Sequence, residues 1–399
     1  MPFDKKICVL GLGYIGFPTA VLLANKGYNV HGVDILQTTV DTINRGDVHI
    51  IEPELDIFAK AAIISGNLIA DTKPIEADIF IIAVPTPLHK NNRPNIDHVI
   101  EATRSISSFI KKGNIVILES TSPIGTTEII ETTLKSEGVD TSKIHLAHCP
   151  ERVLPGHIMR ELVENDRIVG GLTHEATEEA VSFYKTFVSG EIFATNAKIA
   201  EFAKLTENAF RDTNIAFANE LSILCDQFDI DVLELIRLSN RHPRVNILQP
   251  GSGVGGHCIA IDPWFIVHSG GDNAKLIKTA RDVNNYKTEW VIEKIISTAH
   301  SFNEKYSRKP LIACMGLAFK PNIDDLRESP ALYITKSLIE RGYEIIASEP
   351  NISKYEGIHL VDYNYAVERA DLVIFLVAHR EFINLKANIF LDFCNATKQ

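Results

Sequence analysis

Residues 7–16 read ICVLGLGYIG, an apolar run that leads directly into three closely spaced glycines. A short, unbroken apolar run is typical of a strand buried on both faces. Gly11, Gly13 and Gly16 have the spacing GxGxxG, and Pro18–Lys26 continues as a helix. Glycines at this spacing let a pyrophosphate approach the backbone N–H groups at the helix N-terminus. The stretch therefore predicts a strand–turn–helix unit that binds a dinucleotide.

An acidic residue follows at the distance that such a unit requires. Asn29–Ile35 is predicted as the second strand, and Asp34 lies at its end, roughly 20 positions after the glycines. A carboxylate there accepts hydrogen bonds from the adenosine ribose and repels a 2′-phosphate. We therefore expect NAD rather than NADP.

The rhythm of strand and helix then repeats. Further buried strands are predicted at Ala77–Pro87, Asn114–Ser122 and Lys143–Glu151. Strands that alternate with helices at this spacing specify a parallel, doubly wound sheet, whose ligands bind beyond the carboxyl ends of the strands. Four polar residues are predicted at those ends: Thr86, Thr121, Thr127 and Glu151. For Thr121 and Thr127, capping of a helix is an equal alternative to cofactor contact.

A long helix is predicted over Asn196–Phe228, which contains neither Pro nor Gly. Such a helix commonly joins two domains or packs against a symmetry mate. Lys204, Asn208 and Arg211 are spaced i, i+4 and i+7, so they share one face. A solvated surface stripe is the alternative, although Asn is a poor helix former that usually has a local role.

A second α/β unit follows another helical run, Ala274–Ala299. Its predicted elements are Leu311–Leu317, Tyr343–Pro350, Leu372–His379 and Asn388–Cys394 as strands and Pro330–Arg341 as a helix. It lacks GxGxxG, so we expect it to bind something other than NAD. The fold class is thus α/β, with two Rossmann-like doubly wound parallel-sheet domains joined by a long central helix and helical region. The predicted boundaries are 1–195, 196–300 and 301–399.

A glycine-rich stretch between these parts, Gly251–Phe265, reads GSGVGGHCIAIDPWF. Its glycines leave room for the backbone and a bulky substrate to approach closely. If CIAI begins a helix, Cys258 lies at a positive helix terminus, which lowers a thiol pKa from about 8.5 toward neutrality. The alternative is a buried structural cysteine.

Composition narrows the class of protein. The 399 residues carry a formal net charge of -11, which argues against a nucleic-acid groove. The six cysteines form no CxxC, and the histidines form no HxxxH or HExxH pair, so we expect reduced thiols, a cytoplasmic location and no metal site. The apolar N-terminal run is interrupted by glycines and a proline, so we expect neither a signal peptide nor a membrane span.

The chain resembles the UDP-glucose/GDP-mannose dehydrogenase family along essentially its whole length. The motifs that carry the resemblance are GLGYIG, AVPTP, ESTSPIGTT, CPERVLPG, AKLTENAFRD, NRHPRVNILQPGSGVGGHCIAIDPWF and GLAFKPNIDDLRESP. The resemblance implies oxidation of C6 of a UDP-sugar in two steps, with two NAD molecules reduced in succession.

The resemblance also implies roles for individual residues. Cys258 matches the family nucleophile, which holds the aldehyde as a thiohemiacetal and then as a thioester. Lys204 and Asn208 match a lysine and an amide that stabilise the oxyanion. Asp262 matches an aspartate that helps activate water; its alternative role is to cap a helix that starts at Pro263. Glu151 matches a glutamate near the hydrolytic water, and Thr121 completes the catalytic candidates.

Binding residues are implied in the same way. For NAD they are Gly11, Gly13, Tyr14, Ile15, Gly16, Asp34, Thr86, Thr127 and Arg327. For the UDP-sugar they are Arg152, Val153, Lys204, Asn208, Arg211, His242, Arg244, Gly255, Phe319 and Lys320. In the family, the residue that matches Arg244 reaches the substrate of a neighbouring subunit, which suits a homodimer built on the long helix.

The first expectation for the substrate is UDP-N-acetyl-D-mannosamine, oxidised to the uronate for a bacterial surface polysaccharide such as a capsule or the enterobacterial common antigen. UDP-N-acetylglucosamine and UDP-glucose remain alternatives. An enzyme discriminates between epimers at C2 by about 1–3 kcal/mol of binding free energy, and the spacing of motifs in the sequence does not reveal which epimer is preferred. Two alternatives come from other classes. One is a non-catalytic dinucleotide-binding redox sensor with a regulatory Cys258, and the other is a two-electron hydroxyacid dehydrogenase.

Overall fold

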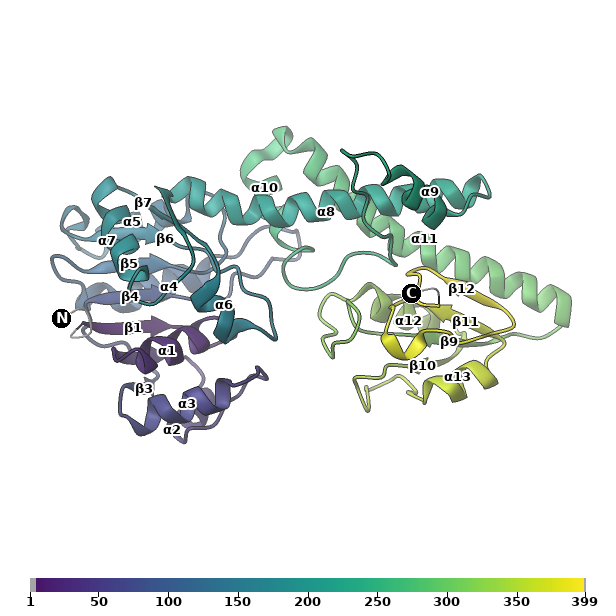
Figure 1. Ribbon diagram of the computed structural model, residues 1–399, viewed down its shortest axis with the longest axis horizontal. Coiled ribbons are helices and arrows are strands. Elements are labelled where there is room, and N and C mark those ends of the chain that lie inside the picture. Colours follow the sequence, from purple (N-terminus) through teal and green to yellow (C-terminus); the bar gives the residue numbers. More distant parts are fainter. Residues whose placement is uncertain (1–4, 398–399) are drawn as a thin grey trace. The chain divides into compact units, whose positions relative to one another are not determined.

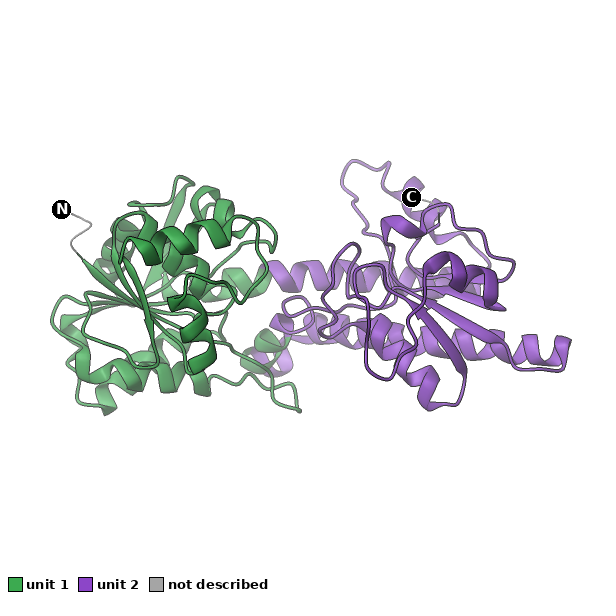
Figure 2. Cartoon of the chain, turned by 90° about the horizontal axis from the view of Figure 1, so that it is seen from below, with its two compact units in different colours: residues 1–206, 264–269 green, residues 207–263, 270–399 purple. Residues whose placement is uncertain are grey.

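The computed structural model describes residues 5–397 and forms two compact α/β units. Unit 1 comprises residues 1–206 and 264–269, and unit 2 comprises residues 207–263 and 270–399; Figure 2 shows them in different colours. Helices α8 (Ala197–Gln227) and α10 (Asp262–Gly270) each contribute residues to both units.

Unit 1 is built on one large sheet (Figure 1). Its strands are β1 (Lys6–Leu10), β2 (Asn29–Val33), β3 (Leu68–Asp71), β4 (Ile79–Ile82), β5 (Ile115–Leu118), β6 (His145–His148), β7 (Arg167–Gly171) and β8 (Ile192–Asn196). Its helices are α1 (Gly16–Asn25), α2 (Gln37–Asn44), α3 (Leu55–Ile64), α4 (Asp97–Ile106), α5 (Thr126–Ser136), α6 (Ile158–Glu164) and α7 (His174–Tyr184).

The strand order of this sheet is β3-β2-β1-β4-β5-β6-β7-β8. All neighbouring strands are parallel except β6 and β7, which pair antiparallel. The order reverses between β1 and β4, and this is the point where ligands of such sheets bind. The predicted parallel, doubly wound sheet is therefore confirmed, with one antiparallel pair added near its edge.

Alternate residues of each central strand enter different cores, which shows that helices cover both faces. Ile7 and Val9 of β1 belong to the core that contains α1 and α3, whereas Cys8 and Leu10 belong to the core that contains α4 and α5. Side chains in a strand alternate between faces, so an unbroken apolar run is the sequence that a two-sided core requires.

Unit 2 contains a smaller, fully parallel sheet of order β10-β9-β11-β12. Its strands are β9 (Leu311–Met315), β10 (Glu344–Ser348), β11 (Leu372–Phe375) and β12 (Phe390–Asp392). Its further helices are α9 (Val232–Ser239), α11 (Lys275–Tyr306), α12 (Pro330–Glu340) and α13 (Tyr363–Arg369). Again the two strand faces enter separate cores: Ile312 and Cys314 pack with α11 and α12, while Ala313 and Met315 pack with α13.

Buried polar side chains join α8 to α11 within unit 2. Arg281 donates to Asp212 at 2.6 Å, and both side chains are almost completely buried. Asn284 donates to the same carboxylate oxygen at 2.8 Å and accepts from Asn219 at 2.9 Å. Because buried polar groups are costly unless they are hydrogen-bonded, this network fixes the register of the two long helices. Within residues 5–397, no helix is both long and apolar enough to cross a bilayer.

Candidate functional site

The glycine-rich turn after β1 has the geometry of a dinucleotide loop. Gly11 adopts φ +89°, and a Cβ there would lie 2.6 Å from the carbonyl oxygen of Ala83. A Cβ at Gly16 would overlap the carbonyl oxygen of Gly11, so this glycine lets α1 start directly against the turn. Gly13, by contrast, has no atom within 4 Å of its would-be Cβ. The first and third glycines are thus required by the chain itself, and the second leaves open space for a pyrophosphate.

Asp34 is oriented by this turn. Its carboxylate accepts from the backbone N–H of Leu12 at 3.0 Å and from that of Leu36 at 2.9 Å. The side chain is only half-buried, so it remains accessible beside the turn. An accessible, pre-oriented carboxylate is the feature that recognises ribose hydroxyls, and the residues present fit NAD.

The loops that follow β4 and β5 are joined by a hydrogen bond. The hydroxyl of Thr86 donates to the carbonyl oxygen of Thr121 at 2.5 Å. Helix α5 begins at Thr126 with Gly125 as its N-cap, so the alternative that Thr121 caps this helix is wrong.

Thr127 is buried in the first turn of α5, where an acidic residue of α8 occupies the helix N-terminus. Glu201 accepts from the backbone N–H groups of Gly125 at 2.6 Å and Thr127 at 2.8 Å, and from the Thr127 hydroxyl at 2.6 Å. Burial raises the pKa of Glu201, whereas these hydrogen bonds lower it less. The capping group is therefore Glu201 rather than Thr127, and the role of Thr127 in NAD binding stays a prediction.

Glu151 lies just beyond β6 in a buried ion pair. One carboxylate oxygen lies 2.7 Å from the guanidinium of Arg167, and both side chains are less than a tenth exposed. A second carboxylate, Glu119, accepts from the Tyr184 hydroxyl at 2.8 Å in the same cluster. Burial raises the pKa of Glu119 to about 7; Arg167 lowers it and the charge of Glu151 raises it. Glu151 is thus held by Arg167, a partner that the sequence analysis missed.

In unit 2, Cys258 is exposed, unlike most of the other thiols in the part of the chain that the structure describes. The alternative that Cys258 is a buried structural residue is wrong. The segment CIAI forms a hydrogen-bonded turn rather than a helix, since the Cys258 carbonyl accepts from the N–H groups of Ile261 at 3.1 Å and Asp262 at 2.9 Å. Helix α10 starts only at Asp262, so the thiol lies one turn before the helix.

The side chain of Asp262 connects this turn to α8. The amide of Asn208 donates to its Oδ2 at 2.6 Å, and both residues are buried. Two predicted catalytic residues are therefore in direct contact, and the backbone of the second binds the backbone of Cys258. Lys204 lies on α8 one turn before Asn208 and is half-buried, whereas Arg211 is exposed.

The glycines before Cys258 are packed against their own unit. A Cβ at Gly256, which has φ +83°, would lie 2.8 Å from the Phe319 ring, and a Cβ at Gly255 would overlap the carbonyl oxygen of Glu328. Gly251 donates its N–H to Asn219 at 2.9 Å. These glycines were expected to leave space for the substrate. The structure corrects this for Gly255 and Gly256: the space beside them is filled by the loop after β9.

That loop carries three predicted binding residues, Phe319, Lys320 and Arg327. The Lys320 ammonium lies 5.7 Å from the centre of the Phe319 ring. Arg327 forms an ion pair with Asp325 at 2.6 Å. Burial is the largest influence on the pKa of Asp325 and raises it, but the hydrogen bonds from Arg327 outweigh it and the pKa is lowered. For His257, burial and the charge of Arg327 both lower the pKa.

The remaining predicted substrate residues lie on two other loops. His242 and Arg244 are exposed on the segment after α9, where the backbone N–H of Arg244 donates to His242 Nδ1 at 3.3 Å. Arg152 and Val153 lie beside Glu151 in unit 1, and the Arg152 guanidinium donates to the carbonyl oxygen of Asp166 at 3.3 Å.

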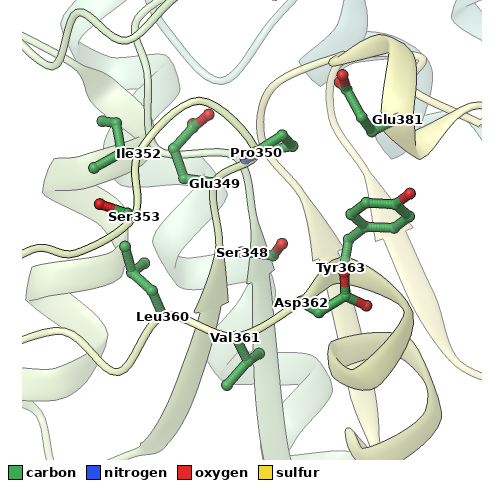
Figure 3. Close-up of a pocket in the computed structure, with 10 residues that line it drawn as sticks. All are labelled: Ser348, Glu349, Pro350, Ile352, Ser353, Leu360, Val361, Asp362, Tyr363 and Glu381. Atoms are coloured by element: carbon green, nitrogen blue, oxygen red, sulfur yellow. The ribbon is translucent and has the colours of Figure 1, made fainter.

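A cavity of about 430 Å³ lies at the carboxyl end of β10 (Figure 3). Three acidic residues are among those that line it, Glu349, Asp362 and Glu381. None of the predicted substrate residues belongs to its lining. Because acidic side chains repel a diphosphate, we do not assign a dinucleotide to this cavity.

Glu349 and its partner His379 are a further pair that the sequence analysis missed. They lie 3.0 Å apart and both side chains are completely buried. A signal for Glu349 existed, because it is an acidic residue at the end of the second strand of the second α/β unit, as Asp34 is in the first. For the described residues 5–397, no group of three or more His, Cys, Asp or Glu is arranged to hold a metal ion.

A dinucleotide loop in one unit and an exposed thiol in the other define the class of a dinucleotide-binding oxidoreductase. Comparison with known families gives the finer assignment. Residues 5–188 match the NAD binding domain, residues 198–286 the central domain, and residues 313–399 the UDP binding domain of one family. The chain belongs to the UDP-glucose/GDP-mannose dehydrogenase family.

Individual relatives match over nearly their whole length. The chain is 54% identical over 408 residues to the UDP-N-acetyl-D-mannosamine dehydrogenase of Campylobacter jejuni, covering 98% of this chain and 99% of the relative. It is 50% identical to an NDP-N-acetyl-D-galactosaminuronic acid dehydrogenase of Ralstonia nicotianae, covering 96% and 92%. A solved structure of the UDP-N-acetyl-mannosamine dehydrogenase of Staphylococcus aureus superimposes with a TM-score of 0.89 at 41% identity, covering 99% and 96%.

Proposed function

We propose that this protein oxidises C6 of UDP-N-acetyl-D-mannosamine twice, giving UDP-N-acetyl-D-mannosaminuronate with reduction of two NAD. The observation that carries the proposal is the exposed Cys258, which is tied through Asp262 to Asn208 on α8. The relatives from Campylobacter jejuni and Staphylococcus aureus support the choice of sugar.

The reaction is balanced as one primary alcohol, two NAD⁺ and one water giving one carboxylate, two NADH and three protons. NAD supplies the acceptor for each hydride. Between the two oxidations, the Cys258 thiolate adds to the C6 aldehyde and forms a thiohemiacetal; loss of the second hydride converts this to a thioester, which water hydrolyses. Without the thiol, no covalent adduct would hold the aldehyde for the second oxidation.

The residues around Cys258 have complementary roles in this proposal. Asn208 donates to the oxyanion that develops at C6, together with the ammonium of Lys204 from the preceding turn of α8. Asp262 orients the Asn208 amide through the 2.6 Å hydrogen bond. From unit 1, we propose that Glu151 contributes to hydrolysis of the thioester and that Thr121 contributes to substrate alignment.

The three parts of the chain divide these tasks. We assign residues 1–195 to NAD binding, residues 196–300 to the catalytic lysine, the cysteine loop and dimer formation, and residues 301–399 to the UDP moiety. The match of residues 313–399 to a UDP binding domain supports the last assignment. NAD chemistry suits a cytoplasmic enzyme, and the uronate suits synthesis of a bacterial surface polysaccharide.

An exposed apolar stripe on α8 supports a homodimer. Phe210, Phe217 and Leu224 are spaced by seven residues, and they are 68%, 55% and 39% exposed. Residues seven apart lie on one face of a helix, and such a stripe marks an interaction surface. Phe217→Asp should convert a dimer to a monomer in light scattering. Ile64→Asp on α3, at a residue 86% exposed, is the matched control and should leave the mass unchanged.

A panel of UDP-sugars with NAD tests the reaction and the substrate together. We expect two NADH per mole of UDP-N-acetyl-D-mannosamine, and little turnover of UDP-N-acetylglucosamine, UDP-N-acetylgalactosamine or UDP-glucose. One NADH per sugar would contradict the four-electron reaction. Preference for another UDP-sugar would contradict the proposed substrate but not the membership of the family.

A further inference from the structure

The two units use the same backbone arrangement around an acidic residue. In unit 1, Gly11 has φ +89° and donates to the carbonyl oxygen of Val33 at 2.8 Å. In unit 2, Gly316 has φ +92° and donates to the carbonyl oxygen of Ser348 at 2.8 Å. In each unit the acidic residue that follows the second strand, Asp34 or Glu349, then accepts from the residue after the glycine.

The two acidic residues differ in exposure. Asp34 is half-buried and remains accessible, as ribose recognition requires. The Glu349 side chain is 0% exposed. Its Oε2 accepts from the N–H groups of Leu317 at 2.8 Å and Ala318 at 3.0 Å and lies 3.0 Å from His379 Nε2. Glu349 therefore cannot bind a ribose, and its carboxylate serves the loop after β9 instead.

The hydrogen bonds of His379 fix its tautomer. Its Nδ1 accepts from the backbone N–H of Asn322 at 3.0 Å. A backbone N–H only donates, so Nδ1 carries no proton and Nε2–H donates to Glu349. Asn322 has φ +61°, and its side-chain oxygen accepts from the N–H of Arg380 at 3.0 Å. The loop is thus anchored at residues 317 and 318 by Glu349, and at residue 322 by His379.

Phe319 and Lys320 lie between these two anchors. The N–H of Phe319 donates to the carbonyl oxygen of Asp325 at 3.1 Å, and its ring lies against Gly256 of the cysteine loop. Because the Glu349 and His379 side chains are buried and hydrogen-bonded to both ends of this segment, they determine where the Phe319 ring and the Lys320 ammonium are presented.

We propose that Glu349 and His379 are positioning residues that hold the loop of Phe319 and Lys320 in the conformation that binds the UDP moiety. The inference rests on the proposed function, in which this loop contacts the substrate. The inference goes beyond the proposed function because it assigns a role in substrate binding to two residues whose side chains are buried away from the substrate. A role in stability alone is the competing explanation, because a buried polar group that loses its hydrogen-bond partner destabilises the fold whatever the loop binds.

Two substitutions of His379 separate these explanations in the full-length protein. His379→Leu removes the hydrogen bonds of the ring with Glu349, Asn322 and Asn351, whereas His379→Gln keeps a donor near the position of Nε2. Affinities for UDP and for NAD are measured by calorimetry on the same samples, together with KM and kcat for the UDP-sugar. We expect His379→Leu to weaken UDP binding and raise KM at least tenfold, with kcat and NAD affinity within twofold of wild type. His379→Gln, which keeps a donor for Glu349 but no acceptor at the position of Nδ1, should lie between wild type and His379→Leu in UDP affinity and KM.

The inference is overturned if His379→Leu lowers Tm but leaves UDP affinity and KM within twofold. If that variant does not bind NAD, it has not folded, and Glu349→Gln replaces it. The side-chain amide of the Glu349→Gln variant would place its own N–H groups against the groups that donate to Glu349 in the wild type. UDP affinity should therefore again fall about tenfold. An unchanged UDP affinity would refute the positioning role. Failure of the wild-type protein to bind UDP would contradict the proposed function itself.

Discussion

The amide nitrogen of Asn208 lies 2.6 Å from Oδ2 of Asp262, and both side chains are buried. This contact joins α8 to the first residue of α10, 54 positions later in the chain. Asn208 and Asp262, which both match family motifs, are therefore hydrogen-bonded to each other beside the cysteine loop.

Asn208→Ala should reduce both stability and turnover. The substitution leaves a buried carboxylate oxygen without its donor, which costs about 1–3 kcal/mol. Loss of an oxyanion donor should also lower kcat by about 10²-fold or more. Urea unfolding and steady-state kinetics measure the two effects. Asn214→Ala, at a half-buried residue of the same helix whose amide donates to the carbonyl of Phe210, is the control and should change neither. A fall in stability with unchanged kcat would restrict Asn208 to a structural role.

Asp34→Ala should weaken NAD binding by roughly tenfold to a hundredfold, because a hydrogen bond to a charged group contributes about 1.5–3 kcal/mol. It should also narrow the preference for NAD over NADP, since the repulsion of a 2′-phosphate is removed. Titration with both dinucleotides measures this. Asp71→Ala, at the end of the neighbouring strand β3, is the control. Equal NAD affinities for the two variants would count against the assigned cofactor loop.

Gly256→Ala should destabilise unit 2. The residue has φ +83°, and the added Cβ would lie 2.8 Å from the Phe319 ring. Strain of this kind costs on the order of 1–3 kcal/mol, and displacement of Phe319 should raise KM for the UDP-sugar. Gly251→Ala is the matched control, because its backbone is not left-handed and its Cβ would meet nothing closer than 3.8 Å. If both variants unfold at the same urea concentration, the packing described for the glycine loop is not important.

Glu119 should make stability fall as pH rises. Burial raises its pKa from 4.5 to about 7 in the folded protein, so between these values the unfolded chain ionises while the folded chain keeps the proton. The unfolded state then binds fewer protons, and the free energy of unfolding decreases over that interval by up to on the order of 3 kcal/mol. Glu119→Gln removes this contribution. Urea unfolding at pH 5 and pH 8 should show the variant gaining stability relative to wild type at the higher pH. If the difference in free energy of unfolding between variant and wild type is the same at both pH values, Glu119 is not protonated in the folded protein.

In unit 1, the sequence predicted strands that contain an unbroken apolar run. Strands β1, β4, β5 and β6 can be recognised from the sequence as apolar runs, because a strand covered by helices on both faces has no polar face. Strand β3 alternates between buried and exposed residues, and β8 is mostly exposed. These strands lie at the two edges of the sheet, and they were not predicted because an edge strand lacks an unbroken apolar run.

For the site, sequence spacing identified side chains on one element but not their partners on others. The contact of Asn208 with Asp262 crosses 54 residues, and that of Glu151 with Arg167 depends on an antiparallel strand absent from the predicted fold. The glycines before Cys258 were interpreted as space for a ligand, whereas Phe319 from a distant loop fills it. Long-range packing decided each of these cases.

The central claim is that the Cys258 thiol carries the aldehyde between two oxidations. Its most direct test is to count uronate formed from UDP-N-acetyl-D-mannosamine by Cys258→Ser, with Cys225→Ser at a buried thiol of the same unit as control. We predict no uronate from Cys258→Ser while NAD and the UDP-sugar still bind, and normal yield from Cys225→Ser. Uronate formed by Cys258→Ser at the wild-type rate would contradict the account.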